Sequence, residues 1–473
     1  MVGSVTNYMT GSLGASSDEG LWLLIGYNTC YYLSLIASPL TITRFGRRNV
    51  WVVGHVTYAV ASIMIALSGG FWSVVGWRML QGLGQGTFFV CAVMTVLRVF
   101  PPAIVFVGFA IFAATSLTGA SLGPAIGGWF SDQNAWPQMF LLLAALALVA
   151  AALVSQVLRD PPDQRVRDAP YDLIGLVLAL IHYFTFHFIT QEGERRDWLG
   201  SPEIAAYCVA FVVFTAAFFL WELRRSVRPF IRVRIFAIHN LRFGVILGFA
   251  LGVPLFGSNI FDQFLQNALG FTSWLAGAEI ALRSITICVV VPIVAYTLAK
   301  QLVDPRYYIF AGFLLVALSY GLLFFGVTSL SDFHTFVVPT LLQGCGFSLL
   351  FSPIARAVIL SLKPEDFLHG IAIFKLTLVT GGAVASTALG VIFDHRNALH
   401  LTRIAGDVTL GSPFILAVGH LNMTSLIGLT SIAEQQSSIL AYADSLQYIA
   451  ILVLLVAPGA LLLKPPPPPP PPR

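Results

Sequence analysis

Three ionisable side chains lie inside long apolar stretches of the sequence. Arg78 falls within 72–98, and Glu279 and Arg283 fall within 273–298. An ionisable group at the centre of a membrane-spanning helix costs at least about 2.5 kcal/mol, and such groups usually face a cavity or a charged partner. These residues therefore indicate a polar site inside an otherwise apolar protein.

Glu279 and Arg283 are four residues apart, so on a helix they share one face and can form an ion pair. Desolvation and a nearby cation act in opposite directions on the proton affinity of such a carboxylate, which suits it to take up and release protons. Glu279 is thus the main candidate for a proton-carrying acid, ahead of Asp262 and Lys375 near helix ends. The alternative is an ordinary interfacial ion pair, since Glu279 lies only about two turns from the outer end of its helix.

Arg78 has no acidic partner in the first part of the chain. No Asp or Glu occurs between Glu19 and Asp132. Three interpretations remain open: an acid on a preceding helix, contact with water and substrate, or a structural role with backbone carbonyls as acceptors.

The stretch "GASLGPAIGG" concentrates small residues in the middle of an apolar run. Gly119, Gly123 and Gly127 are spaced four apart and form one bare helix face, along which another backbone can approach closely. Pro124 removes one backbone hydrogen bond and kinks or softens the helix. Together with Gly128, these residues predict a closely packed helix with a hinge.

The elements that must position these residues are membrane-spanning helices. The chain has 473 residues, of which 57% are hydrophobic and 10% charged. A helix that crosses the hydrocarbon layer needs about 20 apolar residues, and continuous rather than alternating apolar runs exclude a closed barrel. Thirteen runs qualify: 21–42, 50–69, 72–98, 104–130, 137–157, 172–190, 203–222, 241–260, 273–298, 306–326, 333–358, 370–393 and 445–463.

The sequence offers no pattern of a metal centre or an enzyme. The five cysteines fall inside the apolar runs without close spacing, which argues against disulfides or a thiolate metal site. No phosphate loop or GxSxG motif occurs. We therefore expect no metal, no cofactor and no enzymatic activity.

The positions of the basic residues predict the orientation in the membrane. One alternate set of loops holds 17 of the 26 Lys and Arg residues, and cytoplasmic loops collect such residues. This places "TRFGRR" (43–48) and "ELRRSVRPFIRVR" (222–234) in the cytoplasm. It places "QEGERRDWLGSP" (191–202) and a long solvated loop, 394–444, outside; the arginines read as orientation signals rather than nucleic-acid contacts.

An internal repeat divides the chain into two parallel halves. "LQGLGQG" at 80–86 matches "LQGCGFS" at 342–348, and the same offset of 262 residues aligns Gly128 with Gly390 and Arg44 with Arg306. Helices 172–190 and 203–222 have no counterpart. The predicted division is an N-terminal half (1–157), an inserted helix pair (158–240), a C-terminal half (241–464) and a polyproline tail (465–473).

The repeat also predicts a fourteenth helix. The first helix of the second half, 241–260, corresponds to positions before Met1, and residues 1–20 are too short and polar to span a membrane. We expect a truncated or misassigned start, with thirteen of fourteen helices visible; the alternative is a true thirteen-helix protein.

Three motifs resemble those of the major facilitator superfamily. "GASLGPAIGG" resembles the antiporter signature of the fifth helix, and "WRMLQGLGQG" resembles the fourth-helix motif, with Arg78, Gln81 and Gly82 in place. "TRFGRR" resembles the basic loop between helices two and three. That loop retains four residues of its pattern: Arg44, Gly46, Arg47 and Arg48.

The resemblance extends through "YDLIGLVLAL", "QEGERRDWLGSPEI" and "ALRS" to the fourteen-helix drug:proton antiporters of the EmrB/QacA type. The basic loop departs from the family pattern, because Thr43 stands where an acid is usual and Pro39 where a glycine is usual. In the family that acid takes part in contacts that latch the cytoplasmic side. The resemblance therefore leaves this part of the gating mechanism open.

The resemblance implies an all-α integral membrane protein with two six-helix pseudo-repeats and two inserted helices. It implies alternating-access export of hydrophobic or amphipathic small molecules in exchange for protons, in a bacterial inner membrane. Adaptor and outer-membrane subunits are possible partners; nucleic acid is not. Proton-coupled uptake by the same fold is the alternative, and a membrane receptor is a more distant one because no soluble domain is predicted.

Overall fold

The computed structural model describes residues 2–101, 104–160, 172–224, 229–359, 361–407 and 423–464. Within these ranges the chain is helical and contains no strand. Thirteen helical segments in the same ranges are long and apolar enough to cross a membrane. The predicted thirteen spans and the all-helical fold are confirmed.

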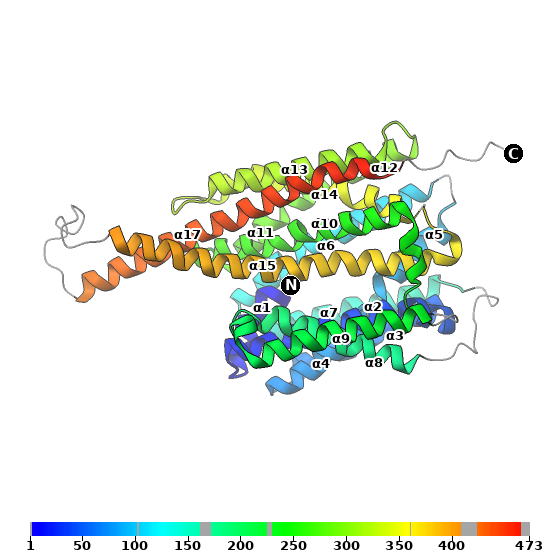
Figure 1. Ribbon diagram of the computed structural model, residues 1–473, viewed down its shortest axis with the longest axis horizontal. Coiled ribbons are helices and arrows are strands. Elements are labelled where there is room, and N and C mark those ends of the chain that lie inside the picture. Colours follow the sequence, from blue (N-terminus) through cyan, green and yellow to red (C-terminus); the bar gives the residue numbers. More distant parts are fainter. Residues whose placement is uncertain are drawn as a thin grey trace.

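The helices fall into three groups in chain order (Figure 1). The first group comprises α1 (Val2–Ser12), α2 (Ser17–Phe45), α3 (Arg47–Leu67), α4 (Phe71–Gln85), α5 (Phe88–Val99), α6 (Val105–Asp132) and α7 (Trp136–Val157). The inserted pair is α8 (Leu173–Glu192) and α9 (Pro202–Arg224). The last group comprises α10 (His239–Gln263), α11 (Ser273–Ala281), α12 (Arg283–Ala299), α13 (Pro305–Gly326), α14 (Phe333–Ile359), α15 (Phe367–Asp407) and α17 (Met423–Val456).

Two of the predicted spans are interrupted. The fourth is divided into α4 and α5 at Gly86, where a β-carbon would overlap with the backbone of α2 at Tyr31 and Leu35. The ninth is divided into α11 and α12 at Leu282.

We name the two ends of the helix bundle by their residues. The basic end carries Arg47 at the start of α3 and Arg306 near the start of α13. The opposite end carries Asp132 at the end of α6 and Ser273 at the start of α11.

The repeat is visible in helix contacts. Helix α10 lies along α15, and α1 lies on α6, the helix that corresponds to α15 at the offset of 262 residues. Trp136 at the start of α7 donates a hydrogen bond to Ser12 at 2.9 Å, which places the end of α1 at the opposite end of the bundle. Because α1 has 11 residues and α10 has 25, α1 covers less of its partner.

Helix α6 joins the two groups of helices. It packs against α11 and α12 of the last group far more extensively than against α5 or α7 of its own. In Figure 1, α6 accordingly lies among the helices α10 to α14.

The prediction of a solvated loop over 394–444 is wrong for the residues that the structure describes. Helix α15 continues to Asp407 and α17 begins at Met423, so the two helices project together past the other helices (Figure 1). Asp444 accepts hydrogen bonds from Arg396 and, at 2.8 Å, from His400. These pairings satisfy the polar side chains across the hairpin, and the helices therefore persist beyond their apolar segments; residues 408–422 and the polyproline tail lie outside the described ranges.

Candidate functional site

Arg78 is buried on α4 and takes its partners from uncharged side chains. Its guanidinium donates to the side-chain oxygen of Gln81, and Gln81 donates to the hydroxyl of Ser62 at 2.7 Å. The guanidinium also lies over the ring of Tyr27, 4.1 Å from the ring centroid. An aromatic face attracts a cation, most strongly away from water. The sequence left three interpretations of Arg78 open, and the described residues add a fourth. The guanidinium is held by a glutamine and a tyrosine ring, in place of an acid or backbone carbonyls.

The second half contains a corresponding arginine–glutamine pair. Gln343 stands 262 residues after Gln81, and it accepts a hydrogen bond from Arg283 at 3.0 Å. Here the arginine comes from α12 rather than from the helix of the glutamine, and it also donates to the carbonyl of Ile280 at 3.1 Å. The glutamine position is thus shared by both halves, whereas the arginine reaches it from different helices.

Glu279 does not pair with Arg283, contrary to the expectation from their spacing. The interruption at Leu282 lies between them, and Arg283 turns to Gln343 instead. Glu279 is fully buried, and neither carboxylate oxygen has a hydrogen-bond partner among the described residues, although Thr340 is a polar neighbour. It is therefore not an exposed interfacial ion pair.

Helix α6 makes a seam with α11 at Gly128, on a different face from the predicted stripe of Gly119, Gly123 and Gly127. A β-carbon at Gly128 would overlap with the carbonyl of Ser273, and one at Gly277 would overlap with the backbone of Ala125 next to Pro124. Each helix thus supplies a glycine where the other backbone passes. We call this contact the α6–α11 seam.

The predicted glycine stripe has a different environment. Gly123 and Gly127 are buried. Gly119 is exposed, and a β-carbon there would meet nothing within 4 Å. The close approach of α11 occurs at Gly128 and Ala125 instead, on another face of α6.

Asp132 closes the α6–α11 seam with hydrogen bonds. Its carboxylate accepts from the backbone N–H groups of Ser273 at 3.0 Å and Trp274 at 2.8 Å. The first N–H groups of a helix have no partner within the helix, and a carboxylate there also meets the positive end of the helix dipole. The end of α6 thus caps a helix of the other half.

A pocket lies between the same two halves, nearer the basic end. It is lined from α5, α6, α14 and α15, and Ser352 is its one polar lining residue. Five phenylalanines dominate it: Phe89, Phe109, Phe112, Phe351 and Phe374. The rings of Phe112 and Phe351 meet across the two halves with centroids 6.3 Å apart.

The predicted basic loop forms a tight junction between α2 and α3. Gly46 has φ of 85°, which a glycine adopts without strain. Arg44 lies over the Phe45 ring at 5.6 Å, and Arg48 donates to the carbonyl of Ser155 at 2.6 Å. These contacts hold the loop against the end of α7.

Asp160, just beyond α7, supplies an acid to the basic loop. Its carboxylate lies 3.7 Å from the guanidinium of Arg47, with both side chains about 5% exposed, and accepts from the backbone N–H of Arg48 at 2.8 Å. The sequence motif lacks its usual acid at Thr43, and Asp160 lies 112 residues after Arg48 in the chain. Sequence reasoning therefore missed this contact.

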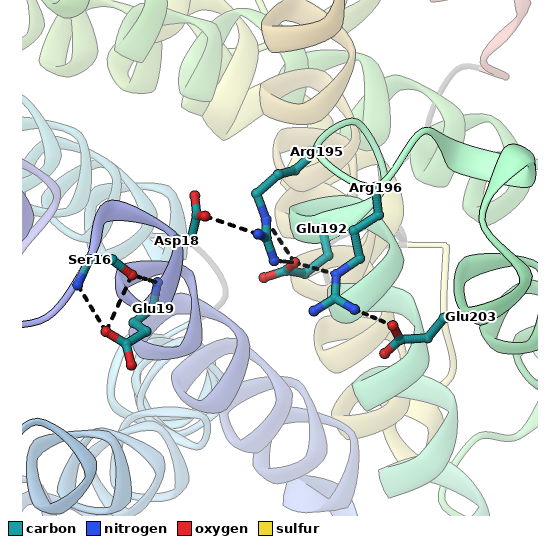
Figure 2. Close-up of polar contacts among 7 residues, drawn as sticks. All are labelled: Ser16, Asp18, Glu19, Glu192, Arg195, Arg196 and Glu203. Carbon is teal, nitrogen blue, oxygen red and sulfur yellow. Dashed lines mark hydrogen bonds and ion pairs between the residues drawn. The ribbon is translucent and has the colours of Figure 1, made fainter.

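A second charged cluster links the inserted pair to the first half at the opposite end. Glu192 accepts from both Arg195 and Arg196, Arg195 reaches Asp18 at 3.0 Å, and Arg196 reaches Glu203 (Figure 2). Hydrogen bonding to Glu192 raises the pKa of Arg196 above its ordinary value. The side chain of Glu192 is buried, so its charge depends on these two arginines.

Comparison with known families identifies the superfamily of this chain. The sequence model of the Major Facilitator Superfamily matches residues 1–300. The chain belongs to this superfamily. Its members are transporters rather than enzymes, and the chain is an integral membrane protein.

Curated proteins resemble the chain over most of its length. The fatty acid resistance protein FarB of Neisseria gonorrhoeae is 25% identical over 407 residues, which cover 85% of this chain and 78% of that protein. The multidrug export protein EmrB of Escherichia coli strain K12 is 22% identical over 406 residues, which cover 86% and 78%. The predicted resemblance to EmrB-type proteins is confirmed.

Solved structures share the fold. A POT family transporter in complex with 5-aminolevulinic acid has a TM-score of 0.61 and 18% identity, covering 96% of this chain and 92% of that one. The human organic anion transporter MFSD10 has a TM-score of 0.57 and 14% identity, covering 97% and 88%. At this level of identity the likeness concerns the fold alone.

Proposed function

We propose that this protein exports hydrophobic or amphipathic small molecules from the cytoplasm in exchange for protons. One observation carries the proposal: the α6–α11 seam closes the opposite end, while an apolar pocket between the same halves lies nearer the basic end. With the basic end in the cytoplasm, this is the arrangement in which a transporter takes its substrate from inside. The names of FarB and EmrB, a resistance protein and an export protein, support the direction.

The glycine and proline residues of α6 serve in this proposal as the outer gate. Outward opening requires the seam at Gly128 and Gly277 to part, together with the cap from Asp132. Pro124 adjoins the contact and supplies a point at which α6 can bend. The basic loop, held through Arg47 and Asp160, belongs to the gate at the cytoplasmic side.

Glu279 is the proposed proton carrier. A carboxylate without partners is costly in its charged form, so its protonation depends on whether water or a cation reaches it as the halves move. Arg78 and Arg283 are proposed to shape the charge of the central cavity. Their glutamine partners, Gln81 and Gln343, hold the guanidinium groups in place.

The proposed location is a bacterial inner membrane. We further propose that the protein works there with adaptor and outer-membrane subunits. FarB and EmrB, the two curated relatives named above, come from bacteria. The hairpin of α15 and α17 projects beyond the other helices and offers Ile427 and Ile432 as exposed apolar side chains. Cross-linking from this hairpin in whole cells tests the partner proposal, and a hairpin that captures only lipid contradicts it.

The main experiment measures proton movement in everted vesicles that contain the protein. We expect addition of a fluorescent amphipathic compound to release protons from energised vesicles and the compound to accumulate. Glu279→Gln is expected to abolish gradient-driven accumulation but to retain exchange of the compound down its own gradient. The matched control is Glu434→Gln, a change of the same type at an exposed position of α17. Accumulation that is unaffected by Glu279→Gln, or by collapse of the proton gradient, contradicts the proposal.

A further inference from the structure

A carboxylate at the end of α10 takes no part in the contacts described so far. Asp262 precedes the last residue of this helix, and one of its side-chain oxygens is buried without a hydrogen-bond partner among the described residues. Such burial is costly for a charged carboxylate. The chain turns from α10 into α11 here, so Asp262 lies toward the opposite end of the bundle, where the α6–α11 seam is.

Gln266 connects this carboxylate to the first residue of α11. Its side chain is the hydrogen-bonding neighbour of Asp262, one turn further along the chain. The side-chain oxygen of Gln266 accepts from the hydroxyl of Ser273 at 3.0 Å. An amide whose oxygen is occupied in this way still has its N–H groups to donate to a carboxylate. The backbone N–H of Ser273 in turn donates to Asp132, so one chain of contacts runs from α10 to the end of α6.

This chain of contacts depends on the protonation state of Asp262. An ionised carboxylate only accepts hydrogen bonds, whereas a protonated one also donates through its O–H group and carries no charge that attracts an amide N–H. The contact with Gln266 is therefore strongest when Asp262 is ionised, and it then directs the oxygen of the amide toward Ser273. Protonation weakens the contacts that keep the start of α11 beside α6.

Arg283 is the charged group that acts on Asp262 from the described residues of the helices around α10. Its positive charge favours the ionised carboxylate. Two further titratable groups belong to the seam helices: Asp132 caps α11, and Glu279 is buried less than two turns beyond Ser273. Each of these two would give the seam a pH dependence of its own if it titrated.

We propose that Asp262 binds a proton from outside and thereby controls the outer gate: its ionised form holds the α6–α11 seam closed, and its protonation releases the seam. The inference deepens the proposed export function, on which it rests for the role of the seam as a gate. Asp262 acts through Gln266 and Ser273, so it is a positioning residue. In the proposed cycle the proton passes from the Asp262 carboxyl to the Glu279 carboxylate, and the seam closes once Asp262 is ionised again.

Thiol labelling of a cysteine in the seam measures its opening. Ser121→Cys places the thiol on the face of α6 that carries Ala125 and Gly128, at a position that is 5% exposed. The Ser121 hydroxyl donates within α6, so the reporter leaves the contacts of Asp262 unchanged. The full chain is labelled in phosphatidylcholine nanodiscs without substrate. Labelling of the native cysteines is subtracted with a protein that lacks the reporter.

The reporter protein is expected to be labelled about tenfold faster at about pH 5 than at about pH 8, after division by the rate of glutathione at the same pH, because thiols react faster as they ionise. Asp262→Asn cannot ionise and should be labelled at the faster rate at every pH, whereas Asp262→Glu should restore the pH dependence. Gln266→Leu breaks the link without altering a charged group and should also give fast labelling at every pH.

The matched control is Asp332→Asn, the same change at the start of α14, where the carboxylate caps its own helix. It is expected to leave the pH dependence intact. A reporter protein that shows no pH dependence overturns the proposal, as does slow labelling of Asp262→Asn at about pH 8 with an unaltered melting temperature. A pH dependence that persists in Asp262→Asn would assign the titration to Asp132 or Glu279 and likewise overturn it.

Proton movement in everted vesicles tests the export function separately, because the labelling experiment contains no substrate. Labelling that depends on pH through Asp262, without any proton-driven accumulation, contradicts the export function alone. Proton-driven accumulation together with labelling that is independent of pH contradicts this inference alone.

Discussion

In the first half of the chain, the glycine-rich helix α6 meets the backbone of α11, a helix of the second half, at Gly128. In the second half, the corresponding helix α15 turns Gly381 toward Phe249 of α10, a helix of its own half. The two helices descend from one repeat pattern, yet one uses small residues between the halves and the other within a half. The same residue type therefore has a different role according to which backbone passes it.

Helix α15 also contacts the inserted pair, and this contact depends on side chains. Helix α15 reaches α8 through the Thr387 hydroxyl, which donates to the carbonyl of Thr190 at 2.9 Å. Helix α8 in turn lies on α2, where His187 meets the ring of Tyr32 at 4.5 Å. The inserted pair thus lies beside the contact between α2 and α15, whereas the α6–α11 seam joins two backbones directly. We expect the seam to respond most sharply to small changes of volume.

The largest expected difference between the halves concerns their basic-end ion pairs. Asp160→Asn removes the partner of a buried arginine, which should lower the free energy of unfolding by about 3 to 5 kcal/mol. Asp304→Asn breaks a basic-end pair of the second half, with Arg306, in which the side chains are 22% and 30% exposed, and should cost at most about 1 kcal/mol. Thermal unfolding in detergent measures the loss of stability in both variants. Equal losses would contradict the predicted difference between the buried and the exposed ion pair.

The α6–α11 seam gives the next prediction. Gly128→Ala inserts a methyl group against the carbonyl of Ser273, and overpacking of this kind costs about 1 to 3 kcal/mol. We expect the transport rate to fall about tenfold. Gly390→Ala is the matched control, because Gly390 is the repeat counterpart and a β-carbon there meets nothing within 4 Å. A comparable loss of transport rate in both variants would contradict the prediction that close packing at the seam makes Gly128 sensitive to added volume.

A smaller effect is expected at the cap that crosses the seam. Asp132→Ala removes the acceptor for two N–H groups of α11 and should disfavour the closed seam by about 1 kcal/mol. Asp332→Ala removes a cap within α14, where the carboxylate accepts from Thr335 at 3.0 Å, and should not open the seam. Thiol labelling of Ser273→Cys reports seam opening. We expect faster labelling in Asp132→Ala than in Asp332→Ala. Equal labelling rates in the two variants would contradict the role of Asp132 in closing the seam.

The smallest effect is expected at the exposed link of the inserted pair. Asp18→Asn should cost less than about 1 kcal/mol and lose its effect in high salt, since Asp18 is 58% exposed. Glu192→Gln should cost more and persist in salt, because that carboxylate is 1% exposed and serves two arginines. Melting temperatures at low and high ionic strength separate the two. A salt-independent loss for Asp18→Asn would contradict the assignment.

Much of the helical architecture followed from local composition. The thirteen spans were predictable because each needs only a long apolar run, and the repeat indicated that α6 and α15 correspond. The pairing of Glu279 with Arg283, expected from their spacing, does not form, because Arg283 donates instead to Gln343 on another helix. The helical hairpin beyond 394 was missed for a related reason: polar residues there pair with each other across two helices, through Asp444, rather than remaining solvated.

By itself, the sequence determined that this protein spans a membrane, that it has two related halves and that α6 carries a face without side chains. These properties depend on residue types and on their spacing along the chain. Only the tertiary structure decided that α11 meets α6 at Gly128 rather than along that face, that Asp160 contacts the basic loop, and that Lys375 lies over the ring of Phe89. Such contacts join residues far apart in the chain, and they form because helices from both halves must share one apolar interior.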